Sequence, residues 1–108
     1  MNSLNLSPVK KIELIMEGQH QEFATDLLDR AGVTGYTIIG NVSGRGRHGF
    51  HEGHLMFNED AVLIMIIVAV PPELVDPILE GFEPFFSKHT GMVFISDIQV
   101  SRLVKIRS

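Results

Sequence analysis

The stretch Gly35-Tyr-Thr-Ile-Ile-Gly-Asn-Val-Ser-Gly-Arg-Gly-Arg-His-Gly49 decides the fold class of this chain. Its first half, Tyr36 to Val42, is rich in β-branched residues and predicts a strand. Its second half has the Gly44-x-Gly46-x-x-Gly49 spacing, which in dinucleotide-binding folds leads directly into a helix. Here residues 50–60 (FHEGHLMFNED) contain another glycine and lack a helical apolar stripe. The glycines are therefore predicted to lie in a long loop between two strands.

This loop is predicted to hold an anion. Glycines allow successive backbone N–H groups to turn inward and form an anion-binding nest. Arg45 and Arg47 add forked donors whose geometry matches phosphate or carboxylate. A nucleotide phosphate is the first candidate, and a plain glycine-rich surface loop is the alternative that the sequence leaves open.

Apolar patterns before this stretch predict a strand and a helix. Residues 10–17 (KKIELIME) alternate apolar and charged side chains, which is typical of a strand. Apolar residues recur at helical spacing from Phe23 to Ala31, and the following Gly32 is a typical helix stop.

A third strand is predicted at residues 61–70 (AVLIMIIVAV), which are apolar on both sides. A sheet covered by helices on one face only would leave alternate residues of this strand as an exposed apolar patch. Another copy of the chain is the simplest cover for that patch, so we expect an oligomer.

The last third of the chain predicts a helix and a closing strand. Pro71-Pro72-Glu73 is typical of a first helical turn, and an apolar stripe follows it. We expect a kink or a break at Pro77 or Pro84, because proline fits poorly inside a helix. Residues 92–96 and 99–106 predict one or two strands.

The order βαββαβ predicts an α+β fold of the ferredoxin-like kind, with both helices on one face of an antiparallel sheet. A single domain is expected over residues 1–108, because this length is typical of one domain. Residues 1–8 are interpreted as an N-terminal tail, and residues 43–60 as the long loop.

Composition excludes several classes of protein. The chain is 44% hydrophobic and 20% charged, which is ordinary for a globular domain. It has no cysteine, which excludes disulfides and thiol catalysis. The first residues lack the apolar core of a signal peptide, and residues 61–70 are too short to span a bilayer. We therefore expect a cytoplasmic protein.

The net charge of −4 argues against nucleic acid as a partner, because nonspecific binding needs a basic surface. The cations are nevertheless unevenly distributed. Of the nine Lys and Arg residues, two lie in the glycine loop and three lie at the C-terminus, namely Arg45, Arg47, Arg102, Lys105 and Arg107. If the two segments meet, they form one positive site. Solvated charges at a strand end are the alternative.

The chain resembles the PII signal-transduction superfamily over about residues 9 to 107. The resemblance is carried by five segments in the right order, which are Gly32–Thr37, Gly44–Arg47, Val70–Asp76, Thr90-Gly91 and Arg102–Arg107. It implies a homotrimer that binds adenine nucleotides in clefts between subunits. It also implies that the loop after the second strand, residues 43–60, signals to a target protein.

The resemblance further implies which residues bind the nucleotide. The adenine and ribose would be contacted by Ile15, Gly35, Tyr36 and Thr37. The phosphates would be held at the base of the loop by Gly44, Arg45, Gly46, Arg47 and His48. Lys105 and Arg107 would reach the phosphates from the neighbouring subunit.

Two departures from the classical pattern favour ADP or AMP over Mg-ATP. Leu63 and Met65 stand where classical members have lysines for a γ-phosphate or a 2-oxoglutarate complex. The usual glycine-, aspartate- and lysine-containing loop is missing, because Gly91 leads directly into Met92. These departures resemble the PII-like proteins of bacterial inorganic-carbon uptake, including the carboxysome-associated kind.

For that kind, bicarbonate is the implied second ligand, and Arg45, Gly46 and Arg47 are the residues we expect to hold it. The implied target is a membrane transporter or a carboxysome-related protein. No cofactor beyond these ligands is expected.

A metal site is the alternative. His48, His51 and His54 recur every three residues in the loop, and neutral imidazoles at that spacing bind Zn²⁺ or Cu²⁺. The divalent-cation tolerance proteins share the trimeric ferredoxin-like fold. His20 and His89 are interpreted as exposed helix-end residues.

Catalysis has less support. Acylphosphatases use the same fold with an anion-binding arginine, yet no carboxylate–histidine or Ser–His arrangement stands out in this chain. We therefore expect a regulatory binding protein and no enzyme.

Overall fold

The structure, a computed structural model, describes residues 6–43 and 62–101. Its elements follow the predicted order, with a short 3-10 helix before each α-helix. They are β1 (Leu6–Glu17), η1 (Gly18–His20), α1 (Gln21–Ala31), β2 (Thr37–Val42), β3 (Leu63–Val70), η3 (Pro72–Leu74), α2 (Val75–Phe86) and β4 (Gly91–Ser101).

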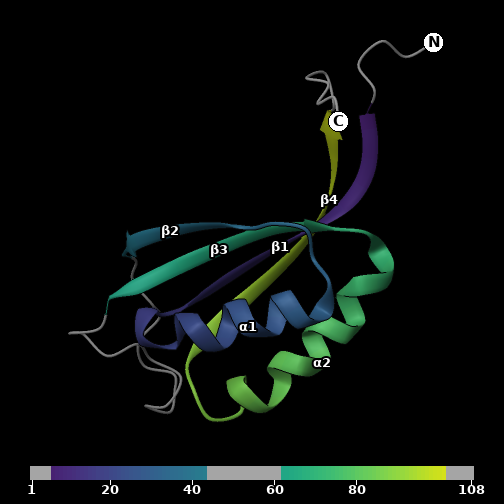
Figure 1. Cartoon of the computed structure of the whole chain (residues 1–108). Coiled ribbons are helices and arrows are strands. Elements are labelled where there is room, and N and C mark those ends of the chain that lie inside the picture. Colours follow the sequence, from purple (N-terminus) through teal and green to yellow (C-terminus); the bar gives the residue numbers. More distant parts are fainter. Residues whose placement is uncertain (1–5, 44–61, 102–108) are drawn as a thin grey trace.

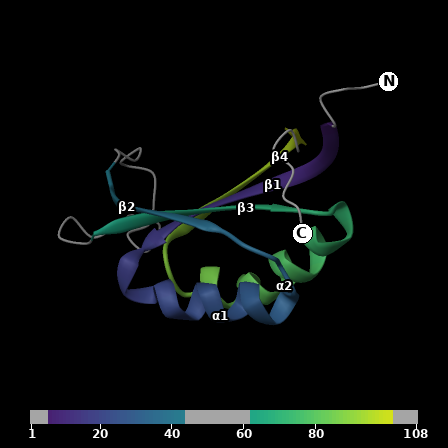
Figure 2. The ribbon, with the colours of Figure 1, turned by 45° about the horizontal axis from the view of Figure 1, so that its top comes forward.

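The strands form one antiparallel sheet in the order β2-β3-β1-β4. Both helices lie on the same face of this sheet, and the opposite face carries no element of the described chain (Figures 1 and 2). This arrangement confirms the predicted α+β fold of the ferredoxin-like kind.

The hydrophobic core lies between the sheet and the helices. Alternate residues of β1 and β3 point toward the helices, because side chains along a strand alternate between its two faces. Burying an aliphatic or aromatic side chain of this size contributes about 1.5–3 kcal/mol. The buried core consists of Ile12, Leu14, Met16, Ala24, Leu28, Ile64, Ile66, Val68, Val70, Ile78, Phe82 and Phe85.

Helix α1 ends where the sequence predicted. Gly32 has a φ of 91°, in the left-handed region that favours glycine. In this conformation the Gly32 N–H donates to the Asp29 carbonyl at 3.1 Å, and the Val33 N–H donates to the Leu28 carbonyl at 3.3 Å. Among the described residues, neither helix has the length and apolar character needed to cross a membrane.

Helix α2 differs from the prediction, because it continues from Val75 to Phe86 without a break. Pro77 lies in the first turn, where backbone N–H groups have no partner inside the helix. Pro84 lies near the C-terminal end, and the ladder resumes after it, since the Ser87 N–H donates to the Glu83 carbonyl at 3.0 Å. Each proline therefore removes little from the helix, and the expected break is absent.

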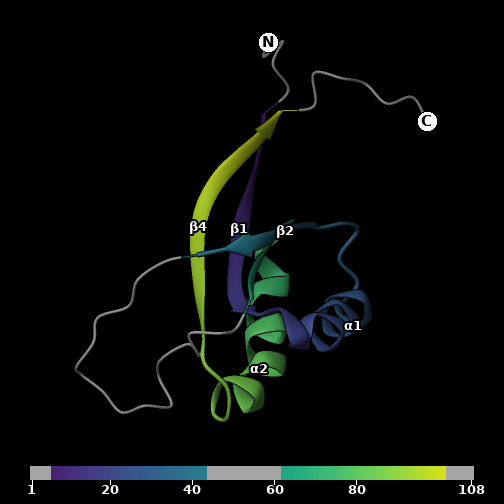
Figure 3. The same ribbon diagram turned by 90° about the vertical axis from the view of Figure 1, so that its left-hand side faces the viewer.

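The first strand is also longer than predicted. It begins at Leu6, so residues 6–8 belong to β1 and not to an N-terminal tail. They pair with β4 from Leu6↔Ser101 onward, whereas pairing with β3 stops at Lys10↔Val70. This two-stranded extension turns away from the helices (Figures 1 and 3). Pro8 is tolerated there because one side of β1 has no neighbouring strand.

Candidate functional site

The sheet face opposite the helices carries two of the predicted nucleotide-binding residues. Ile15 pairs with Met65 of β3, and Thr37 of β2 pairs with Ile67 of the same strand. Leu14, the neighbour of Ile15 in β1, is buried on the helix side, so Ile15 lies on the opposite side. Ile67 lies between the buried Ile66 and Val68, so Ile67 and its partner Thr37 also lie on that opposite side. Ile15 and Thr37 therefore share one face and are separated by β3.

Gly35 and Tyr36 lie just before β2 in a different setting. The Tyr36 side chain is half-buried and packs against the core, so it is not on the face that carries Ile15 and Thr37. Gly35 is exposed, and a Cβ placed on it would meet nothing within 4 Å. The backbone around Gly35 is thus open on the side where a side chain would project.

A β-bulge at the end of β2, which the sequence analysis missed, lies at the base of the glycine loop. The register runs from Ile39↔Met65 to Val42↔Leu63, so β2 has one residue more than β3 over this interval. The inserted stretch includes Asn41, whose φ of 53° is uncommon for a residue with a side chain. The bulge therefore changes the direction of β2 between Ile39 and Val42, just before Gly44. The Gly40-Asn41 dipeptide inside a strand pattern was the available signal.

The connection from α2 to β4 is packed tightly against β1. A Cβ on Gly91 would lie 2.2 Å from Cε1 of Phe86 and 2.9 Å from the carbonyl oxygen of Ile15. Real Cβ atoms do not approach this closely, so only glycine fits without movement. Gly91 thereby fixes the start of β4 beside the backbone of Ile15.

The open face is apolar around two charged side chains. Ile39, Met92 and Phe94 are 44%, 48% and 47% exposed. This confirms that a single chain leaves an apolar sheet face uncovered. Glu13 lies directly beside Phe94, and Lys11 lies one row further along β1, with its Nζ 3.5 Å from Oε2 of Glu13.

Two histidines contribute to an aromatic cluster at the helix ends. The ring centroids of His20 and His89 are 4.4 Å apart, and both rings contact Phe85. His20 is half-buried, in contrast to the expectation that it is exposed. Within residues 6–43 and 62–101, no group of three or more His, Asp or Glu side chains is arranged to hold a metal ion.

The remaining predicted site residues lie outside the described residues. These are the phosphate-binding residues Gly44, Arg45, Gly46, Arg47 and His48, the alternative metal ligands His51 and His54, and the C-terminal cations Lys105 and Arg107. Their predicted roles stay predictions.

The solved structures that are similar to this chain include three of CPII from Thiomonas intermedia K12. The apo form, described as a nitrogen regulatory PII-like protein, is 64% identical with a TM-score of 0.79, covering 91% of this chain and 97% of that chain. CPII bound to ADP, AMP and acetate is 63% identical with a TM-score of 0.79, covering 96% and 99%. CPII bound to ADP and bicarbonate is 65% identical with a TM-score of 0.76, also covering 96% and 99%.

A comparison with curated proteins finds no match. The model of the family described as "Nitrogen regulatory protein P-II" matches residues 9–107, which is nearly the whole chain. The matched range includes every strand and helix from Val9 onward, together with the open sheet face and the glycine loop. The chain therefore belongs to the P-II family of nitrogen regulatory proteins.

Proposed function

We propose that this chain is a PII-like regulatory protein that binds ADP or AMP between the subunits of a homotrimer, with bicarbonate as a second ligand. The observation that carries the proposal is the 65% identity, over 96% of this chain, to CPII bound to ADP and bicarbonate. A second CPII structure holds ADP and AMP. At this level of identity, related chains commonly keep their ligands.

The described part of the site is compatible with a bound adenine. Ile15 offers an apolar side chain on the open face, and Thr37 offers a hydroxyl on the same face. The space beside Gly35 would admit a planar base. Tyr36 would contribute through its backbone, because its ring packs against the core.

The phosphates are assigned to the loop that follows the bulge in β2. Arg45 and Arg47, with the amides of Gly44, Gly46 and His48, would surround them, and Lys105 and Arg107 would approach from the neighbouring subunit. Bicarbonate, a small planar anion, suits the arginine forks and amides of Arg45, Gly46 and Arg47. Leu63 stands where the family resemblance implies a lysine in classical members, and the absence of that lysine favours ADP and AMP over ATP.

The homotrimer is supported by the apolar open face, because a second copy of the chain would cover Ile39, Met92 and Phe94. The bound ligands would change the conformation of the loop at residues 43–60, and the loop would report inorganic-carbon and energy status to a target. A membrane transporter or a carboxysome-related protein is the proposed target. The protein acts by binding and not by catalysis.

Isothermal titration of ADP tests the nucleotide site. Arg47→Ala and Arg107→Ala each remove a charge-assisted contact, so each should weaken ADP binding about ten- to hundredfold. Lys88→Ala, a cation after α2, is the matched control and should leave the affinity unchanged. Unchanged ADP affinity in both arginine variants would place the site elsewhere.

The bicarbonate proposal is tested by repeating the ADP titration in bicarbonate and chloride buffers of equal pH and ionic strength. Coupled ligands typically change each other's affinity by about five- to 150-fold, and the change is reciprocal. The chloride control is needed because added bicarbonate also changes screening. Identical ADP affinity in the two buffers would leave a nucleotide sensor without an inorganic-carbon input.

A further inference from the structure

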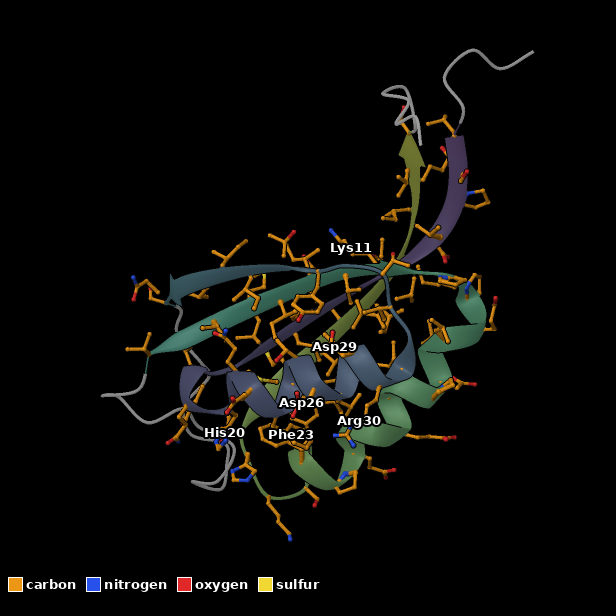
Figure 4. All side chains as sticks on the ribbon, in the orientation of Figure 1. Lys11, His20, Phe23, Asp26, Asp29 and Arg30 are labelled. Carbon is orange, nitrogen blue, oxygen red and sulfur yellow. The ribbon has the colours of Figure 1, made fainter. Side chains whose placement is uncertain are left out.

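The open face of the sheet has an ion pair at its centre. Glu13 lies in a cross-strand row with Ile67 of β3 on one side and Phe94 of β4 on the other. Lys11 lies one row further along β1, between Ala69 and Ser96. Figure 4 shows the Lys11 side chain pointing away from α1, on the helix-free side of the sheet.

Any partner that covers the apolar residues of this face must also cover the ion pair. Phe94 is 47% exposed in the single chain, and it lies directly beside Glu13. The side chains of Lys11 and Glu13 are already partly covered, at 32% and 26% exposure. A charge that becomes buried without a partner is costly, whereas a paired charge is tolerated.

Charge neutrality points to a second copy of this chain as the partner. In a cyclic assembly, the same position recurs around the axis in every subunit. Unpaired Glu13 carboxylates would then bring like charges together in a water-poor interface. Lys11, at 3.5 Å from Glu13 in the same chain, neutralises each carboxylate before the copies meet. The face is therefore electrostatically compatible with copies of itself.

We propose that the Lys11–Glu13 pair is buried between subunits of the assembly, where its neutrality makes the open faces compatible with one another. The inference rests on the homotrimer of the proposed function and adds the two charged residues on which the interface depends. Each subunit contributes both charges, so the pair is complete before assembly. Assembly then depends on both charges being present or both being absent.

The strand provides a matched control. Lys10 forms an ion pair with Asp97 of β4, and this pair lies on the opposite side of β1 because neighbouring residues alternate. Lys10→Met and Lys11→Met thus remove the same charge from adjacent residues of one strand. The two substitutions differ in the sheet face that they alter.

Sedimentation velocity over a range of protein concentrations tests the proposal, with circular dichroism to check that each variant folds. In Lys11→Met and in Glu13→Gln, the concentration at which half of the protein is assembled should rise at least about tenfold, because one charge is left unpaired. The double variant K11M/E13Q and the control K10M should both stay within about threefold of the unaltered protein.

The charge-swapped variant K11E/E13K keeps the pair and covers the case in which a single variant fails to fold. It should assemble within about threefold of the unaltered protein, since neutrality is preserved. A swapped variant that folds but remains monomeric would overturn the proposal. So would single variants that assemble normally, or a K10M variant weakened as much as K11M. If the unaltered protein is itself monomeric, the homotrimer of the proposed function fails as well, whereas a normal trimer with unaffected variants removes this inference alone.

Discussion

The two faces of the sheet are built from the same four strands but are completed differently. On the helix face, Ile12, Leu14 and Met16 are fully buried within a single chain. On the open face, the alternating residues are also largely apolar, yet Met92 and Phe94 remain about half exposed. The helix face is therefore completed within one chain, whereas the open face keeps apolar side chains exposed in the single chain.

The difference between the two faces predicts that a Phe→Ala substitution has different effects on each. Near the helix face it should lower stability, and on the open face it should weaken assembly. Phe82→Ala in α2, which packs against the helix face, should lower the free energy of unfolding by about 3–5 kcal/mol at every protein concentration, because a buried ring is lost. Phe94→Ala on the open face should change the unfolding of the isolated subunit by less than about 1 kcal/mol. Its main effect should be weaker assembly, which appears as a loss of the concentration-dependent part of stability.

Urea unfolding at low and high protein concentration, with light scattering to follow the oligomeric state, measures both effects. This difference between the two faces would be contradicted if Phe94→Ala destabilised the dilute protein as strongly as Phe82→Ala. That outcome would mean that the open face is part of the core of the single chain.

Substitutions at two glycines distinguish packing within the chain from contacts with a ligand. Gly91→Ala should lower the free energy of unfolding by about 1–3 kcal/mol, because the added Cβ meets the Phe86 ring and the Ile15 carbonyl. Gly35→Ala should change unfolding by less than about 1 kcal/mol, because its Cβ meets nothing in the chain. If Gly35 contacts the adenine as proposed, Gly35→Ala should instead weaken ADP binding.

Chemical denaturation and ADP titration of the two variants provide the measurement. Equal stability of Gly91→Ala and the unaltered protein would show that the connection after α2 can shift. A loss of ADP affinity in Gly91→Ala alone would indicate that the adenine binds near the start of β4 and not beside Gly35.

The helix face could be predicted well from the sequence, because its pattern is local. The alternation in residues 10–17 and the helical spacing from Phe23 to Ala31 each repeat within one element. A break at the prolines of α2 is absent, because the number of backbone hydrogen bonds that a proline removes depends on its position in the helix. Pro77 and Pro84 lie near the two ends of the helix, where few backbone bonds are lost. The start of β1 was misplaced because residues 6–8 are ordered by β4, from the other end of the chain.

The site was predictable only in part, because it depends on features that composition does not encode. The resemblance to the family selected Ile15 and Thr37, and the structure places both on the open face. The resemblance also selected Tyr36, but the Tyr36 ring packs against the core and not on the open face. The bulge at Asn41 arises from a register shift between β2 and β3, and no single segment reveals such a shift.

That bulge gives the smallest predicted effect and tests whether the end of β2 is shaped for the loop that follows it. Asn41 is exposed and has a φ of 53°, so its side chain contributes little packing, and its backbone conformation decides the outcome. Asn41→Gly should change the free energy of unfolding by less than about 0.5 kcal/mol, because glycine adopts this conformation readily. Asn41→Val should lower it by about 1–2 kcal/mol, because a β-branched residue resists positive φ. If the bulge also orients the loop at residues 43–60, Asn41→Val should weaken ADP binding more than its loss of stability explains, whereas Asn41→Gly should leave binding nearly unchanged. Calorimetry at a temperature where both variants are fully folded separates the two effects. Equal ADP affinity in the two variants would show that the bulge ends the strand without positioning the ligand.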